Sequence, residues 1–92
     1  MITLKIPTPL RTYTNGQTEI GVQGGTVAAA MNDLVTQFPA LRPHLFNGKA
    51  ELRPFVNLFI NSENIKDLHG LDTPLEDGDR LMLIPSIAGG RE

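Results

Sequence analysis

Apolar and polar residues alternate in two short segments near the start of the chain. The alternation covers residues 2–6 and 18–22, and a period of two is typical of a strand with one buried face. Pro7 ends the first segment, because proline cannot continue a strand ladder. Asn15-Gly16 is a strong turn signal before the second segment. These features predict an opening hairpin whose connection is longer than the tightest kind.

The periodicity then changes to that of a helix. A glycine pair at 24–25 allows the chain to change direction, and the hydroxyl of Thr26 is suited to cap a helix N-terminus. Apolar residues recur at helical spacing over residues 27–38, which predicts an amphipathic helix of roughly three turns. Pro39 ends it, because the residue before a proline avoids the helical region. A short second helix is expected between residues 41 and 46.

The second half of the chain predicts more strands and no further long helix. The most strand-like run covers residues 55–60, Ile65 is expected in a short strand, and residues 81–84 form the last strand. A turn at 77–79 precedes the last strand, and Pro85 is expected to end its pairing. The order β-β-α-β-(β)-β is typical of an α+β domain. We expect a β-grasp fold, with a mixed sheet of four or five strands, one main helix, and the last strand parallel beside the first.

The same alternation assigns the two faces of the sheet, because successive side chains of a strand point to opposite sides. The residues expected to face the helix are Val56, Leu58, Ile60, Leu81 and Leu83. Apolar residues that are exposed together on a sheet face mark interaction sites. The predicted partner surface consists of Phe55, Phe59, Met82, Ile84 and Pro85. The alternative is that a loop or the chain's own tail covers this face.

Composition restricts the classes of function. The 92 residues make one domain, which we expect at residues 1–87, followed by a flexible tail at 88–92. The absence of cysteine excludes disulfides, thiolate metal sites and cysteine nucleophiles. A net charge of −2 and singly scattered basic residues argue against nucleic acid as a partner. No apolar run approaches the ~20 residues of a membrane span, and no leader pattern precedes the first strand, so a cytoplasmic location is expected.

The side chains offer little catalytic chemistry. His44 and His69 have no neighbour at ligand spacing, and a surface or loop position is the simpler explanation for each. The acidic residues around Gly78 fit a turn better than a site. We therefore expect no metal site, no cofactor site and no enzyme.

The glycine pair near the C-terminus is a stronger candidate for a functional group than these side chains. Gly89 and Gly90 follow Ala88 soon after the last predicted strand. Because glycine has no Cβ, such a segment threads a narrow tunnel and presents its carboxylate to another protein's active site. The alternative is a frayed chain end without a role.

Several motifs match a known family. Residues 76–90 read as an acidic turn, an apolar strand, a proline, a small residue and Gly-Gly. Further motifs match the sulfur carriers of mycobacterial cysteine synthesis, namely Ile6-Pro7-Thr8, Leu10-Arg11, Asn15-Gly16 and Phe55-Val56-Asn57. On these motifs the chain resembles the ThiS/MoaD sulfur carriers, which are ubiquitin-like β-grasp domains. The similarity extends from the first strand to Gly90.

The resemblance implies a carrier that is itself a substrate. In such families an E1-like enzyme, which binds the ATP, adenylates the terminal glycine, and sulfide or a persulfide then displaces AMP to leave a thiocarboxylate. The reactive group here is the Gly90 carboxylate. The expected acceptor is a PLP-type amino-acid synthase of cysteine or homocysteine-type synthesis, or another sulfur acceptor. Ile84 matches the apolar position that contacts the activating enzyme in the molybdopterin carriers, and a monomer is expected.

Arg91 and Glu92 depart from the usual family ending at the second glycine. Gly90 cannot be adenylated while its carboxyl group is bonded to Arg91. By similarity, we expect a JAMM-type zinc metalloprotease to cleave the Gly90–Arg91 bond. The alternative is that the two residues come from a cloning scar or an incorrect stop.

Three other functions fit the same residues. The first is the small subunit of molybdopterin synthase, which uses the same thiocarboxylate chemistry. The second is a ubiquitin-like modifier that is joined through Gly90 to lysines of other proteins. The third is a plain interaction domain, whose function a Gly90→Ala replacement leaves unaffected.

Overall fold

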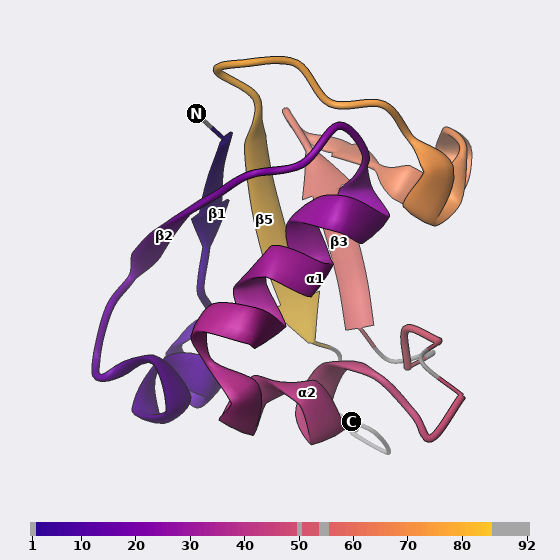
Figure 1. Ribbon diagram of the computed structural model, residues 1–92. Helices are drawn as coiled ribbons and strands as arrows, with labels where there is room; N and C mark the ends of the chain where they lie inside the picture. Colours follow the sequence, from indigo (N-terminus) through magenta and orange to yellow (C-terminus); the bar gives the residue numbers. More distant parts are fainter. Residues whose placement is uncertain (1, 50, 54–55, 86–92) are drawn as a thin grey trace.

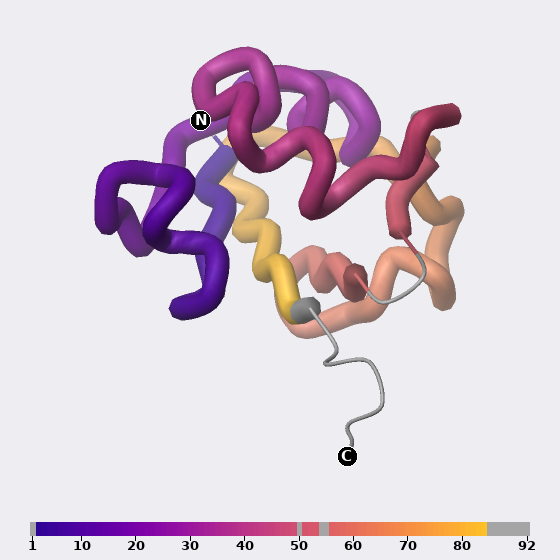
Figure 2. Tube along the Cα trace, turned by 90° about the horizontal axis from the view of Figure 1, so that it is seen from below, coloured from indigo at the N-terminus to yellow at the C-terminus, as the bar shows by residue number. Residues whose placement is uncertain are grey.

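The computed structural model describes residues 2–49, 51–53 and 56–85. Within these residues five strands form one sheet in the order β2-β1-β5-β3-β4 (Figure 1). The strands are β1 (Ile2–Lys5), β2 (Glu19–Val22), β3 (Val56–Ile60), β4 (Glu63–Asn64) and β5 (Arg80–Pro85). Helix α1 (Val27–Gln37) crosses one face of this sheet. Seen from below, the helical segments drawn in magenta lie together on one side of strands β5 and β3 (Figure 2).

The central pair of strands is parallel. β1 and β5 place Leu4 beside Leu81 and Lys5 beside Met82, whereas the three other strand pairs are antiparallel. Parallel neighbours need a long crossover connection, and the chain between these two strands includes α1. The predicted β-grasp arrangement, with a mixed sheet and the last strand parallel beside the first, is confirmed.

The opening hairpin is confirmed as well, and its long connection contains a 3-10 helix, η1 (Thr8–Thr14). Just after β1, the Ile6 N–H donates to the Thr18 carbonyl at 2.8 Å, so the alternating pattern continues one residue beyond the strand. Asn15 and Gly16 follow η1 with φ values of 57° and 81°. Asparagine and glycine accept this left-handed region most readily, which is why the pair signals a turn.

Helix α1 begins and ends where the sequence predicts. The Thr26 Oγ1 accepts a hydrogen bond from the Ala29 N–H at 3.2 Å and so satisfies one free donor of the first turn. Phe38 is the C-terminal cap, and Pro39 begins a 3-10 turn, η2 (Pro39–Leu41). The predicted short second helix follows as α2 (Arg42–Leu45). The residues that α1 buries are Val27, Ala30, Met31, Leu34 and Val35.

One local prediction is wrong. Ile65 lies in a 3-10 helix, η3 (Ile65–Asp67), because the Oδ1 of Asn64 accepts from the Lys66 N–H at 2.9 Å and starts a helical turn there. Pro85 ends the pairing of the last strand as predicted, because it is the last residue of β5 and the last in register with β3, opposite Val56. Proline lacks the N–H donor but keeps its carbonyl, so a terminal strand position tolerates it.

One hydrophobic core lies between the sheet and the helices. Leu4, Leu58 and Leu34 are fully buried there, one from each of β1, β3 and α1. The segment after η4 (Gly70–Asp72) closes one end, because the Thr73 carbonyl accepts from the Val27 N–H at 3.0 Å at the start of α1. None of the helices among the described residues is long and apolar enough to cross a membrane.

The two glycines between β2 and α1 differ in their surroundings. A Cβ placed on Gly24 would lie 2.6 Å from the Ala30 nitrogen and 2.8 Å from the Ala29 Cβ, which is closer than real Cβ contacts. A Cβ placed on Gly25 would meet nothing within 4 Å. The close approach of the chain to the first turn of α1 therefore requires glycine at position 24 only.

The hairpin between β3 and β4 turns through two residues in the left-handed region. Asn61 and Ser62 have φ values of 47° and 81°. Asn61 is held on both sides of its amide: its Nδ2 donates to Asp79 Oδ1 and its Oδ1 accepts from the Arg80 N–H, each at 3.1 Å. Ser62 is exposed and has no such partner among the described residues. Its backbone conformation is therefore one that an L side chain adopts at a cost.

Replacing Gly24 with alanine is expected to lower the free energy of unfolding by about 1–3 kcal/mol, because the new methyl group displaces the first turn of α1. The matched control is Gly25→Ala, which adds the same methyl group into open space and is expected to change stability by less than about 0.5 kcal/mol. Urea denaturation of the two variants measures the difference. Equal stabilities would show that the strand-to-helix connection relaxes freely.

Replacing Ser62 with glycine is expected to raise the free energy of unfolding by about 1 kcal/mol, because glycine adopts positive φ without the Cβ penalty. Ser62→Ala is the control, since it removes the hydroxyl but keeps the Cβ, and no gain is expected from it. Thermal unfolding of both variants gives the comparison. A glycine variant no more stable than the alanine variant would contradict the strain at this turn.

Candidate functional site

The sheet face opposite α1 carries an exposed apolar strip on β5. Leu81 and Leu83 are each 1% exposed and pack into the core, whereas Met82 is 40% and Ile84 41% exposed. Adjacent residues of a strand point to opposite faces, so the core-facing leucines force Met82 and Ile84 outward. These two are the large hydrophobic side chains that stand most open to solvent among the described residues. An exposed apolar pair on a rigid central strand is suited to docking a partner.

The strand register aligns the neighbours of this strip in a row across the sheet. Glu19 of β2 lies opposite Lys5 of β1, and Lys5 lies beside Met82. On the other side Met82 is paired with Phe59 of β3, which is paired with Asn64. The row therefore runs from an acid through a cation to an apolar centre and then to a neutral amide.

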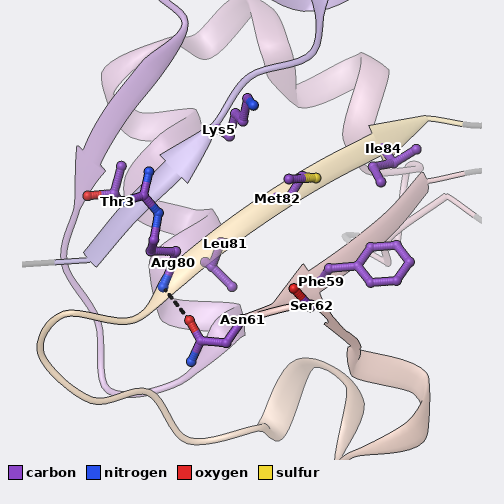
Figure 3. Close-up of a pocket in the computed structure, with 9 residues that line it drawn as sticks. All are labelled: Thr3, Lys5, Phe59, Asn61, Ser62, Arg80, Leu81, Met82 and Ile84. Atoms are coloured by element: carbon purple, nitrogen blue, oxygen red, sulfur yellow. Dashed lines mark hydrogen bonds between the residues drawn. The ribbon is translucent and has the colours of Figure 1, made fainter.

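Two hollows flank the strip. The larger, of about 400 Å³, has the polar residues of β1, β5 and the β3–β4 turn around the apolar side chains (Figure 3). Its lining residues are Thr3, Lys5, Phe59, Asn61, Ser62, Arg80, Leu81, Met82 and Ile84. The smaller, of about 270 Å³, lies between β5 and the segment that follows β1, with Pro7, Thr8 and Arg11 in its wall. Lys5, Met82 and Ile84 line both hollows and so form the ridge between them.

One ion pair crosses the outer face. The Arg80 Nη2 lies 3.2 Å from the Glu19 Oε2, and the two side chains are 68% and 47% exposed. An ion pair this exposed contributes little to stability, because water screens it. On this face, the pair balances the positive charge of Arg80 with the negative charge of Glu19.

The structure brings together part of the predicted partner surface. Phe59 is half-buried and lies on the same face as Met82 and Ile84. Pro85 ends β5 on the same strand. Phe55 lies outside the described residues, as do the predicted tail and processing residues Ala88, Gly89, Gly90 and Arg91.

Sequence reasoning missed the polar half of this face. Lys5 and Ser62 line the larger hollow, although neither was among the predicted site residues. The alternation of β1 already places Lys5 on the outer side. The sequence predicts the last strand beside the first, but it does not give the register between them, and that register places Lys5 beside Met82.

The other polar clusters have structural explanations. The His44 ring packs on Tyr13 with a centroid distance of 4.3 Å, and the backbone N–H of His69 donates to the Thr73 hydroxyl at 3.0 Å in a turn. Around Gly78, Asp79 Oδ2 accepts from the Glu76 N–H at 2.8 Å, as expected for a turn. In the part of the chain that the structure describes, no three histidine or acidic side chains gather as a metal site would require.

Comparisons with known proteins identify the family. The family model described as "ThiS family" matches residues 4–90. Sulfur carrier protein CysO of Mycobacterium tuberculosis is 34% identical over 91 residues, which cover 97% of this chain and 98% of that protein. Small archaeal modifier protein 3 of Haloferax volcanii is 32% identical over 65 residues, which cover 71% of this chain and 70% of that protein.

Solved structures agree. The crystal structure of the Amycolatopsis orientalis BexX/CysO complex matches with a TM-score of 0.89 and 32% identity, over 98% of this chain and 100% of the matched chain. The solution structure of small archaeal modifier protein 1 from Methanosarcina acetivorans matches with a TM-score of 0.85 and 32% identity, over 97% of this chain and 95% of that one. This chain therefore belongs to the ThiS family of small β-grasp sulfur carriers, which are carrier proteins and not enzymes.

Proposed function

We propose that this chain carries sulfur on the carboxyl group of Gly90, for use in cysteine or homocysteine-type amino-acid synthesis. The observation that carries the proposal is the extent of the family match, which ends at residue 90 and leaves Arg91 and Glu92 outside it. The similarity to sulfur carrier CysO over almost the whole of both chains favours this acceptor class over molybdopterin synthesis.

The proposed chemistry has three steps. A JAMM-type zinc metalloprotease hydrolyses the Gly90–Arg91 peptide bond, so that Gly90 gains a free carboxylate and Arg91 a free amine. An E1-like enzyme transfers AMP from ATP to this carboxylate and releases pyrophosphate. Sulfide then attacks the acyl carbon and expels AMP, which leaves a thiocarboxylate directly. If a persulfide attacks instead, AMP leaves and an acyl disulfide forms, which a thiol cleaves to the thiocarboxylate and a disulfide. Its sulfur is a nucleophile for an acceptor such as a PLP-type amino-acid synthase.

The outer side of β5 around Met82 and Ile84, here named the docking face, supports this sequence of steps by its position. Ile84 and Met82 are exposed on β5, the strand that leads directly to the glycine pair. Six residue steps separate Ile84 from Gly90, and an extended chain spans at most about 20 Å over that length. A partner that binds the outer face of β5 can therefore receive Gly90 in an active site within that reach.

The expected partners follow from the same chemistry. The Amycolatopsis orientalis CysO was solved in a complex with BexX, so a similar carrier does bind a partner protein. ATP is bound by the activating enzyme, and this chain contributes the glycine alone. Dependence on ATP implies a cytoplasmic carrier, and a monomer suits transient docking with several partners in turn.

A ubiquitin-like modifier is the second candidate function. The match to small archaeal modifier protein 3 over 71% of this chain favours it. The activated Gly90 would then form an amide bond with a lysine amine of a target protein, with loss of AMP. Both functions share the adenylation step and differ in the nucleophile that follows.

Intact-mass spectrometry of the protein purified from its native cells under sulfur limitation tests the proposal. We expect a species that ends at Gly90, part of it with one oxygen replaced by sulfur. Lysine-linked conjugates of the same species would favour the modifier. A population that consists only of the full chain through Glu92 would contradict both.

Replacing Ile84 with aspartate is expected to raise the KM for activation by the E1-like enzyme at least about tenfold, because a charge must be desolvated at the centre of the interface. Ala28→Asp is the matched control, since it adds the same charge at an exposed position on α1, behind the sheet. ATP–pyrophosphate exchange with chains ending at Gly90 measures the effect. Equal KM values for the two variants would show that Ile84 is not part of the docking face. Exchange supported by the chain that ends at Gly90 and carries no substitution would still support adenylation of Gly90.

A further inference from the structure

Lys5 carries an unbalanced positive charge at the edge of the docking face. It is exposed, and among the described residues its ammonium group has no hydrogen-bond or ion-pair partner. The chain as a whole has a net charge of −2. A cation without a partner among the described residues, beside an apolar strip, is therefore a local feature of this face and not a result of a basic composition.

The neighbouring charges cancel one another. Glu19 lies opposite Lys5 in the β1–β2 pair, but its carboxylate lies 3.2 Å from the Arg80 guanidinium. Asp79, the residue before Arg80, accepts from the Asn61 side chain and the Glu76 N–H through its two carboxylate oxygens. These two carboxylates thus have partners of their own, and neither of them pairs with Lys5.

The position of Lys5 places that charge against the apolar centre. It lies beside Met82 in the register and lines both hollows together with Met82 and Ile84. Arg11 adds a second cation on the same side, in the wall of the smaller hollow, where its Nε donates to the Ile6 carbonyl at 3.1 Å. Figure 3 shows the contrast: Lys5 rises on the β1 side of the strip, and the neutral Asn61 and Ser62 lie on the other.

We propose that Lys5 is a specificity-determining residue of this face, and that it pairs with a carboxylate on the docking surface of the activating enzyme. The inference rests on the proposed function, because it assumes that an adenylating partner docks here. It adds the chemistry of that partner: an apolar centre against Met82 and Ile84, and an acidic side chain on the side that faces β1. Because the cation lies on one side of Met82 and Ile84 only, it fixes the orientation in which the partner binds.

Charge complementarity of this kind acts on the formation of the complex and not on the chemical step. A charge at the rim of an interface changes the association rate and the salt dependence of binding, and a like charge in the same place repels wrong partners. Lys5 lies in β1, whereas the reacting group is the Gly90 carboxyl in the partner's active site, so we assign Lys5 to docking and not to the reacting bond. The effect of its removal should therefore appear in KM and leave kcat unchanged.

The test is steady-state ATP–pyrophosphate exchange by the native E1-like enzyme, with carrier chains ending at Gly90, at low salt and at about 150 mM salt. Lys5→Glu is expected to raise KM about tenfold at low salt, with kcat within about twofold, and the effect should shrink at the higher salt. Lys5→Gln, which removes the attraction without adding repulsion, should give an intermediate KM. Lys66→Glu, an exposed lysine on η3 with the same change in net charge, is the matched control and should leave KM within about twofold.

The outcomes separate this inference from the proposed function. If the unmodified chain supports exchange and Lys5→Glu behaves like Lys66→Glu, Lys5 is an ordinary solvated lysine and the inference is overturned. If the chain that ends at Gly90 and carries no substitution supports no exchange at any concentration of enzyme, the proposed function fails instead. Because Lys5→Glu places a second carboxylate opposite Glu19, the thermal stability of each variant is measured alongside, and Lys5→Gln decides the matter if the glutamate variant is unstable.

Discussion

The parallel pairing of β1 with β5 is the constraint on which the rest of this structure depends. It places the last strand in the middle of the sheet, between β1 and β3, with Leu4 and Leu81 side by side beneath α1. Both leucines are almost completely buried, so the register between these strands is held by the core. A shift of one residue would expose Leu81 and Leu83 and bury Met82 and Ile84.

This arrangement gives β5 two roles at once. Its inward residues complete the core, and its outward residues form the exposed apolar strip that we propose as the docking site. The strand also leads directly to the segment that contains Gly89 and Gly90. A rigid central strand is well suited to this task, because it positions the docking strip and the start of the tail relative to each other without any movement in the domain.

Two contacts at the periphery of the fold help to position β5. Gly24 lets the chain leave β2 and pass closely over the first turn of α1, which brings the apolar face of the helix onto β1 and β5. At the other end, the Asn61 side chain joins the β3–β4 turn to Asp79 and Arg80 and so fixes the point where β5 begins. Both devices are local, and both limit how far the central strands can slide.

The sequence alone determined the elements, the two faces of the sheet and the candidate reactive group. Alternation over short segments and helical spacing after Thr26 predict the elements well, because side-chain periodicity follows directly from backbone geometry. The Gly-Gly pair is a local signal of another kind, and the role of Gly90 stays a prediction. The local error at Ile65 arose where a side-chain cap overrode the pattern. What only the tertiary structure decided is the register between the strands, and therefore that Lys5, Met82, Phe59 and Ser62 share one surface. Lys5 lies more than fifty positions along the chain from each of the other three, and contacts at that separation depend on the packing of the whole core, which no local pattern records.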